Sequence, residues 1–286
     1  IRDRFLPGDA AVAETLIDHA DFLCFTGSTT TGRLVAARAA ARMIPCCLEL
    51  GGKDALVVLD DANLETAAQT AVIGATIATG QICTSVERVY VQRRIHDAFV
   101  ERCVEIAKAQ TLNLDDPEGP GLGPFIHAPQ AETYRQHVAD ARERGAVVHV
   151  GGEVIERGGF WAPPTVLSEV THEMLIMREE TFGPAVPIMA FDRDGDAVHL
   201  ANDCCYGLGA AVFSDDNSRA EGIAGQLQAG AVAINGWDAS RAFPAMPYDA
   251  FGQSGIGPSR GGWESILRFN RRKVLAAWDQ RLLSAR

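Results

Sequence analysis

A cysteine and a glutamate in two short motifs could together carry out covalent acyl chemistry. Cys83 lies in Gly-Gln-Ile-Cys-Thr (residues 80–84), and Glu49 lies 34 residues earlier in Leu-Glu-Leu-Gly-Gly-Lys (residues 48–53). A thiolate attacks an electrophilic carbon, and a carboxylate can later activate the water that releases the acyl group. The alternatives are a buried, inert cysteine and a strand-end glutamate exposed to solvent, which are the commoner roles of these residue types.

A third motif could hold phosphate groups. Phe-Thr-Gly-Ser-Thr-Thr-Thr-Gly (residues 25–32) follows a short apolar run and precedes an Ala-rich segment. A helix that begins there offers free backbone N–H groups and the positive end of its dipole, where a pyrophosphate can bind. The alternative is a helix start that is capped by Ser or Thr and binds no ligand, because such caps are common.

Three further residues are weak candidates on their own. Glu180 and Phe182 lie in Glu-Glu-Thr-Phe-Gly-Pro (residues 179–184), and Asn235 ends the apolar run Ala-Val-Ala-Ile. The alternative is that Glu180 is an ordinary acidic residue of a loop and Phe182 an ordinary aromatic residue of the core. The cysteines and histidines are not spaced so that four of them could surround a metal ion as tetrahedral ligands, so we expect no metal site.

The elements that must position these residues alternate between strands and helices. Regular alternation of this kind predicts an α/β fold in which helices cover parallel sheets. We expect strands at residues 21–26, 44–48, 55–59, 87–92, 146–150, 186–191, 209–213 and 231–235. We expect helices at residues 31–43, 64–79, 96–110, 129–144, 194–202 and 217–228. Residues 115–124 predict an exposed loop, and residues 237–262 predict a long irregular segment of the kind that lines a site.

Composition narrows the function classes. The chain has 286 residues, 47% hydrophobic residues and a formal charge of -11, which favours a globular protein and argues against nucleic acid or an anionic membrane as partner. No stretch approaches the roughly 20 apolar residues of a membrane span. Seven cysteines without a Cys-x-x-Cys pair predict reduced thiols and a cytoplasmic protein.

These motifs together closely resemble the aldehyde dehydrogenase superfamily, and the resemblance runs nearly end to end. It implies that Cys83 forms a thiohemiacetal with an aldehyde, that hydride passes to NAD or NADP, and that Glu49 activates the water that hydrolyses the resulting thioester. Semialdehyde or broad-range aldehyde members are the most similar in sequence context. The residues that the resemblance assigns to the cofactor are Gly27, Ser28, Gly32, Leu50, Glu180 (ribose hydroxyls) and Phe182 (nicotinamide ring). Asn235 matches a family position near the cofactor or substrate pocket.

The resemblance also implies a domain organisation. Residues 1–50 are expected to form the last part of a Rossmann-type dinucleotide-binding domain, residues 51–245 a catalytic domain, and residues 246–286 a returning loop, a helix and an oligomerisation strand at 274–278. Homodimers or homotetramers are the assemblies that the family suggests, and a small aldehyde is the expected substrate.

Two departures from the family leave alternatives open. Members are usually nearly twice as long, so we expect an amino-terminal half, with an oxyanion-hole asparagine and the residues that grip the adenosine ribose, to lie outside this sequence. Met-Pro-Tyr-Asp-Ala-Phe-Gly (residues 246–252) stands where Pro-Phe-Gly-Gly is commoner. The chain alone could therefore be a dehydrogenase, a cysteine esterase, or a non-catalytic remnant that only oligomerises.

Overall fold

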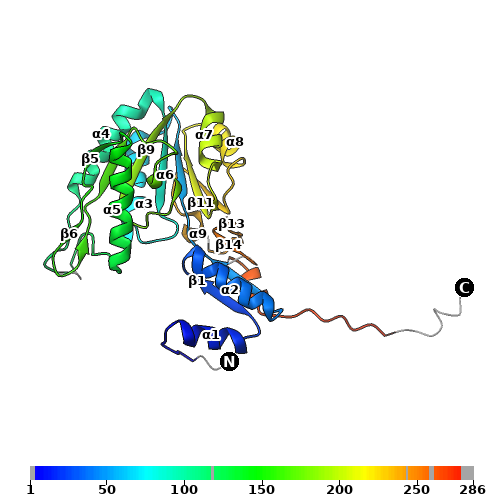
Figure 1. Ribbon diagram of the computed structural model, residues 1–286. Helices are drawn as coiled ribbons and strands as arrows, with labels where there is room; N and C mark the ends of the chain where they lie inside the picture. Colours follow the sequence, from blue (N-terminus) through cyan, green and yellow to red (C-terminus); the bar gives the residue numbers. More distant parts are fainter. Residues whose placement is uncertain (1–3, 117–118, 243, 258–260, 278–286) are drawn as a thin grey trace, which may run out of the picture.

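A seven-stranded sheet forms the centre of the larger part of the molecule (Figure 1). The structure is a computed structural model, which describes residues 4–116, 119–242, 244–257 and 261–277. Every neighbouring pair of strands in the order β12-β11-β3-β4-β9-β8-β5 is parallel except β5 and β8. The strands are β3 (Asp54–Val58), β4 (Val86–Gln92), β5 (Val147–Val150), β8 (Thr165–Ser168), β9 (Ala185–Phe191), β11 (Gly209–Phe213) and β12 (Ala231–Ile234).

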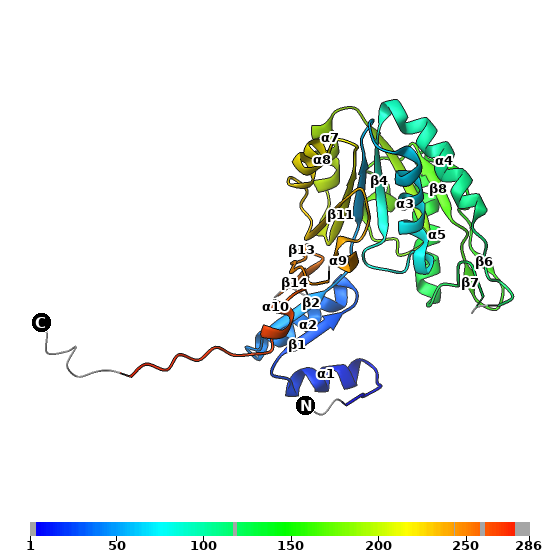
Figure 2. The same cartoon turned by 180° about the vertical axis from the view of Figure 1, so that it is seen from behind.

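Helices cover both faces of this sheet. One face packs on α3 (Leu64–Thr76) and α4 (His96–Ala109), which lie in front of the sheet in Figure 2. The other face packs on α5 (Ala128–Glu143), α6 (Leu175–Arg178), α7 (Asp194–Asn202) and α8 (Asn217–Ala224). Val57 belongs to the second core and its neighbours Leu56 and Val58 belong to the first, because successive side chains of a strand point to opposite faces.

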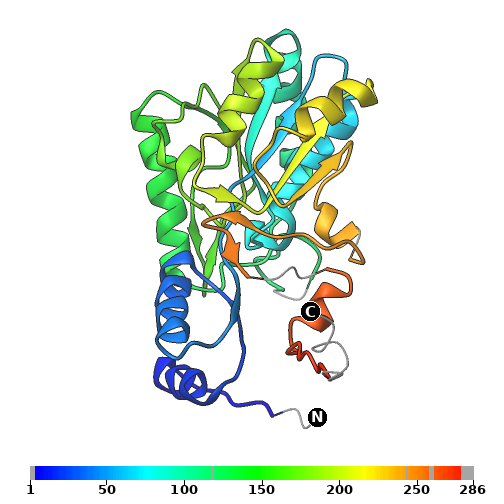
Figure 3. The ribbon, with the colours of Figure 1, turned by 90° about the vertical axis from the view of Figure 1, so that its right-hand side faces the viewer.

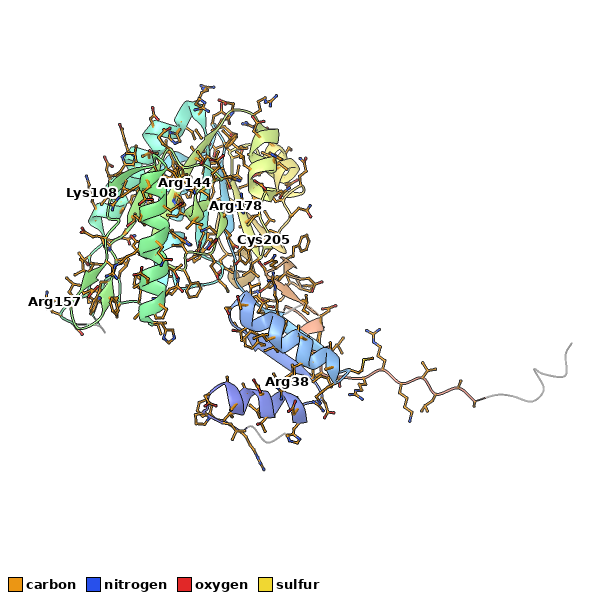
Figure 4. The ribbon with its side chains drawn as sticks, viewed as in Figure 1. Arg38, Lys108, Arg144, Arg157, Arg178 and Cys205 are labelled. Atoms are coloured by element: carbon orange, nitrogen blue, oxygen red, sulfur yellow. The ribbon has the colours of Figure 1, made fainter. Side chains whose placement is uncertain are left out.

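A smaller three-stranded sheet lies at one end of the larger one. Its strands β1 (Leu23–Thr26) and β2 (Cys46–Glu49) are parallel, and β14 (Gly255–Ile256) adds to β2 in the antiparallel direction. Two helices, α1 (Ala10–His19) and α2 (Thr29–Ala41), accompany this sheet, and Arg38 of α2 binds Asp18 and Glu14 of α1 (Figure 4). The small core consists of Ile17, Val35, Leu48 and Leu50.

The remaining elements are short. They are the 3-10 helices η1 (Ile77–Gly80) and η2 (Arg93–Ile95), the hairpin strands β6 (Ile155–Glu156) and β7 (Phe160–Trp161), the pair β10 (Tyr206–Gly207) and β13 (Phe251–Gly252), and the one-turn helices α9 (Ala239–Ala242) and α10 (Glu264–Leu267). Figure 3 shows the orange segment that carries β13 and β14 between the two sheets. Within the described residues, no helix has both the length and the apolar content to cross a bilayer.

The α/β fold predicted from the alternation of elements is confirmed, and the differences are local. Helix α2 begins two residues earlier than expected, at Thr29, and the helix expected at 64–79 ends at Thr76, where η1 follows. The irregular segment 237–262 contains α9 and two short strands. The strand expected at 274–278 is not formed over residues 274–277, and Trp278 lies outside the described residues. A strand that pairs between subunits cannot form within one chain.

Candidate active site

The predicted site residues gather where the two sheets meet. Residues 50–53 connect the carboxyl end of β2 to the amino end of β3, so this segment crosses from the small sheet to the large one. Cys83 lies on the turn before β4, and Glu180 and Phe182 lie just before β9. The site therefore combines the carboxyl ends of the parallel strands β1 and β2 with the amino ends of β3, β4 and β9. Ligand sites of open α/β sheets usually lie at carboxyl ends alone.

An unusual backbone holds the Cys83 turn. Ala78, Thr79 and Gly80 all have positive φ, at 50°, 61° and 72°, which non-glycine residues adopt only when their surroundings impose it. The Thr79 hydroxyl donates a hydrogen bond to the Gly123 carbonyl at 2.9 Å. A Cβ on Gly80 would lie 2.4 Å from the Gly183 backbone, so only glycine fits there. These contacts fix the half-buried Cys83 outside any regular element.

Gln81 fastens the same turn to a loop. Its side-chain nitrogen donates to the Pro124 carbonyl at 3.2 Å, and its side-chain oxygen accepts from the Ile126 amide at 2.8 Å. The amide thus satisfies a donor and an acceptor of residues 124–126 at once, which gives the glutamine of the Gly-Gln-Ile-Cys motif a structural role.

The two glycines after Glu49 bring the motifs into contact. A Cβ on Gly52 would lie 2.2 Å from the Cys83 carbonyl oxygen, and a Cβ on Gly51 would lie 2.5 Å from a Glu180 carboxylate oxygen. The Gly52 amide donates to Glu180 Oε1 at 2.9 Å. Position 52 needs glycine because a backbone carbonyl approaches it so closely, whereas a side chain at position 51 would displace the Glu180 carboxylate.

Glu49 is buried at the end of β2, where it pairs with Thr26 of β1 and Gly255 of β14. Together with Tyr248 and Asp249 it lines a cavity whose free volume of about 0 Å³ leaves no room for a water in this structure. Cys83 is not among the residues that line this cavity. Its neighbour Thr84 lines a second cavity, and Tyr248 lines both. The structure thus brings the Glu49 and Cys83 motifs together through the backbones of Gly52 and Cys83, and Tyr248 lines the cavity beside each motif.

The phosphate-site candidates surround the start of α2. Ser28 caps this helix, since its hydroxyl accepts from the Thr31 amide at 3.2 Å, and the first turn has no acidic residue. Gly27 and Ser28 are exposed, and the Gly27 amide donates to the Glu49 carbonyl at 3.2 Å. A Cβ on Gly32 would lie 2.4 Å from the Leu50 side chain. Gly32 and Leu50 are therefore buried against each other and position the exposed turn.

Glu180 and Phe182 lie on the segment just before β9. The Gly52 amide holds Glu180, and the Glu87 carboxylate holds the Phe182 amide. Burial, and then the charge of Glu87, raises the pKa of Glu180 to about 7, while its bond from the Gly52 amide acts in the opposite direction. Phe182 has a φ of 49° and its amide donates to Glu87 Oε1 at 2.8 Å. Glu180 is half-buried at the meeting point of the sheets, so its carboxylate can face a ligand.

A buried ion pair beneath the site escaped the sequence analysis. The Lys53 ammonium donates to Glu87 Oε2 at 2.5 Å and to the Thr181 hydroxyl at 3.1 Å. The Thr181 amide donates to the same Glu87 oxygen at 2.7 Å. A β-bulge explains the position of Glu87. Asp54 pairs with Val86 and the next residue, Ala55, pairs with Arg88, so Glu87 is the extra residue of β4 at the bulge. The signal was present: two charged residues interrupt the otherwise apolar Val-Glu-Arg-Val-Tyr-Val of β4.

Replacing Lys53 with methionine should destabilise the fold by about 3 to 5 kcal/mol, because it leaves Glu87 charged and buried without its partner. The free energy of unfolding in urea measures this change. The matched control is Arg102→Met, which removes surface pairs with Glu65 and Glu105 and should cost about 1 kcal/mol or less. Equal losses in the two variants would contradict the role of the buried pair.

Asn235 does not join this group. It follows β12 with a φ of 53°, and its side chain bonds to both backbone groups of Ser214, which follows β11. The chain then turns back, so that the Trp237 indole donates to the Thr84 carbonyl at 2.7 Å and Thr84 donates to Asp238 at 3.1 Å. Trp237 and Asp238 are thus the residues of this segment that reach the Cys83 turn, and a place for Asn235 near the cofactor or substrate pocket stays a prediction.

Comparison with known proteins agrees with this arrangement. The model of the aldehyde dehydrogenase family matches residues 4–275. Lactaldehyde dehydrogenase of Escherichia coli is 41% identical over 239 residues, which are 82% of this chain and 49% of that protein. Betaine aldehyde dehydrogenase of Sinorhizobium fredii is 37% identical over 257 residues, which are 88% of this chain and 52% of that protein. The chain spans about half the length of the curated relatives it matches.

A solved structure gives the same result in three dimensions. Betaine aldehyde dehydrogenase of Staphylococcus aureus in complex with NAD+ superposes with a TM-score of 0.84 and 32% identity, over 90% of this chain and 52% of that one. The folded arrangement, the matched range and the identities lead to one conclusion: this chain belongs to the aldehyde dehydrogenase family.

Proposed function

We propose that this chain carries the nucleophile and base of an NAD(P)-dependent aldehyde dehydrogenase, which oxidises an aldehyde to a carboxylic acid. One observation carries the proposal. The segment from Glu49 to Lys53 contacts the Cys83 turn through Gly52, Glu180 through Gly51 and Gly52, and the start of α2 through Leu50 and the Glu49 carbonyl. A single short connection thus joins the candidate base, nucleophile and cofactor residues.

In this proposal Cys83 acts as the nucleophile. Its thiolate attacks the aldehyde carbon and forms a thiohemiacetal, whose oxyanion requires fixed N–H donors such as the Cys83 amide. The turn at residues 78–81 supports this role, because its positive φ angles and hydrogen bonds fix its backbone. N–H donors stabilise an oxyanion best when they are already fixed in position before the reaction. Loss of a hydride from the thiohemiacetal carbon to bound NAD or NADP would convert it to a thioester. Glu49 then removes a proton from the water that attacks the thioester, the C–S bond breaks, and the carboxylic acid leaves as the Cys83 sulfur is restored.

The residues at the start of α2 fit a dinucleotide. Gly27 and Ser28 are exposed at the positive end of a 13-residue helix, and no acidic residue of the first turn opposes a pyrophosphate. Bound NAD or NADP would supply the hydride acceptor. Glu180 would accept hydrogen bonds from ribose hydroxyls, and Phe182 would pack beside the nicotinamide ring.

Cofactor affinity should depend on Glu180 and on pH. Because the pKa of Glu180 is raised to about 7, its charged form, which accepts hydrogen bonds more strongly, grows as pH rises through that value. We expect NAD to bind more tightly at about pH 8 than at about pH 6. Glu180→Gln should weaken binding by roughly tenfold and remove this pH dependence.

Calorimetric titration with NAD measures both effects. The control is Glu179→Gln, which alters the exposed neighbouring carboxylate. The same affinity and pH profile in Glu180→Gln and in the unchanged chain would exclude Glu180 from the cofactor site.

Aldehyde-dependent reduction of NAD and of NADP, run alongside hydrolysis of a nitrophenyl ester, tests the function. A dehydrogenase reduces a nicotinamide only when aldehyde is present. Ester hydrolysis without reduction would favour the cysteine esterase, and neither activity would favour a non-catalytic oligomerising chain. A series of small aldehydes that includes lactaldehyde and betaine aldehyde, which the relatives' names indicate, defines the substrate class.

We further propose the domain division at residues 50 and 245, a homodimer or homotetramer, and a cytoplasmic location. The pairing of β14 with β2 supports placing part of residues 246–286 beside the dinucleotide-binding part. Residues 271–277 leave the body in extended form, as Figures 1 and 2 show, and Val274 and Leu275 are highly exposed, which supports an oligomerisation role. Light scattering of the purified chain measures the oligomeric state.

A further inference from the structure

A buried carboxyl that the proposed mechanism does not use lies beside Gly52, the residue that abuts the Cys83 turn. Asp54 begins β3, and its Oδ1 accepts from the Gly209 amide of β11 at 3.0 Å. A Cβ on Gly209 would lie 2.3 Å from Asp54 Oδ2, and a Cβ on Gly52 would lie 3.1 Å from Oδ1. Gly52 is also the residue that abuts the Cys83 carbonyl. Asp54 therefore connects β11 to the segment against which the nucleophile turn rests.

Two small cavities flank this carboxyl. One is lined by Asp54, Thr84, Trp237, Asp238 and Tyr248, and so reaches the residue after Cys83. The other is lined by Asp54 together with Lys53, Arg88 and Tyr206. Each has a free volume of about 10 Å³, which leaves room for about one water centre. Asp54 thus lines both cavities, one with Thr84 of the Cys83 turn and the other with Lys53 of the buried ion pair.

The charges around Asp54 oppose its ionisation. Burial is the largest cause that raises the pKa of Asp54 to about 8, and the carboxylates of Glu87 and Asp238 act in the same direction. The Gly209 amide and the Arg88 guanidinium act against it. Its other titratable neighbours are those that line the cavities: Lys53, Tyr206 and Tyr248. Because the pKa is raised, most of this carboxyl carries at pH 7 a proton that a carboxylate lacks.

We propose that Asp54 is a positioning residue for the nucleophile: its neutral carboxyl holds the Cys83 turn against β11, and its ionisation releases the turn. Asp54 and Thr84 line the same small cavity, and the Thr84 hydroxyl donates to Asp238, so one water in this cavity would link the Asp54 proton to the Thr84 oxygen. An ionised Asp54 would instead face Asp238 and Glu87 as a third negative charge in a site of low dielectric. The consequence for catalysis rests on the proposed function, whereas the release of the turn does not.

The sign of the pH effect follows from the raised pKa. The folded chain holds this proton up to about pH 8, whereas an unfolded aspartate loses it near 3.8, so folding grows less favourable between those values. The local consequence, loosening of residues 81–85, is expected as pH rises through about 8. Asp54→Asn keeps an oxygen acceptor for the Gly209 amide and cannot ionise.

Hydrogen exchange and thiol alkylation test the proposal on the full chain. After division by the intrinsic rates, exchange of the amides at residues 81–85 should accelerate roughly tenfold from about pH 7 to about pH 9 in the unchanged chain. The Asp54→Asn variant should show no such step. The rate of Cys83 alkylation by iodoacetamide, read by peptide mass spectrometry, should show the same difference between the two chains.

Both readouts work without turnover, so they decide the proposal even if the chain oxidises no aldehyde. If it does oxidise aldehydes, kcat should fall above about pH 8 in the unchanged chain and less steeply in Asp54→Asn. Identical exchange and alkylation profiles in the two chains would overturn the proposal. If the variant fails to fold, the unchanged chain alone tests the proposal. The proposal would then be overturned if exchange of the amides at residues 81–85 changed with pH no more than exchange of the amides of α5.

Discussion

Aldehyde oxidation should fall by about four orders of magnitude or more when Cys83 is replaced with alanine, because no other group then forms the covalent intermediate. The expected change lies in kcat, since Cys83 acts on the reacting carbon and does not hold the cofactor. Steady-state rates of nicotinamide reduction with saturating aldehyde measure it. NAD affinity should stay within about twofold of that of the unchanged chain.

The control for this variant is Cys24→Ala. Cys24 is an exposed thiol of β1, far from the turn before β4, and its loss should leave kcat unchanged. A Cys83→Ala variant that keeps even a tenth of the activity would exclude Cys83 as the nucleophile.

Glu49→Gln should separate the two halves of the reaction. The thiohemiacetal and the hydride step do not need a base at Glu49, so the first turnover should remain, whereas hydrolysis of the thioester should slow by about 10² to 10⁴. We therefore expect a burst of reduced nicotinamide followed by slow turnover. Intact-mass spectrometry of the variant after mixing with aldehyde and NAD should detect the acyl group, and peptide mapping should place it on Cys83.

Glu143→Gln on the exposed face of α5 is the matched control, and it should neither change turnover nor trap an adduct. A Glu49→Gln variant that hydrolyses its thioester at the normal rate would assign the base to another residue. Asp249, which lines the same cavity as Glu49, is the next carboxylate to test.

The sequence allowed the type of fold and the motifs to be predicted, because these depend on local patterns. The apolar run of β3 is visible in the sequence. So is the helical spacing of the apolar residues that α3 and α4 contribute to the core. The close approach of the Cys83 carbonyl to Gly52 was not predicted, because it depends on a contact between segments about 30 residues apart. The roles of Cys83, Glu49, Glu180 and Phe182 remain predictions for the experiments above.

Other features depended on pairings that no local pattern carries. Strand β14 has two residues, so it has no periodicity to detect, and its partner β2 is about 200 residues away. Lys53 and Glu87 are charged residues whose burial becomes intelligible only when the bulge in β4 turns them toward each other. Ala78 and Thr79 adopt positive φ although neither residue type favours it, so the end of α3 was placed too late. In each case tertiary contacts outweigh the local preference.

The late pairing of β14 has a consequence for how the chain is made. On a ribosome that adds roughly 5 to 20 residues per second, about 10 to 40 seconds separate the synthesis of Glu49 from that of its partner Gly255. During this interval one side of β2 has unsatisfied backbone groups that can pair with another nascent chain. Expression at low temperature, or with a chaperone that shields exposed strands, should therefore raise the yield of correctly assembled molecules.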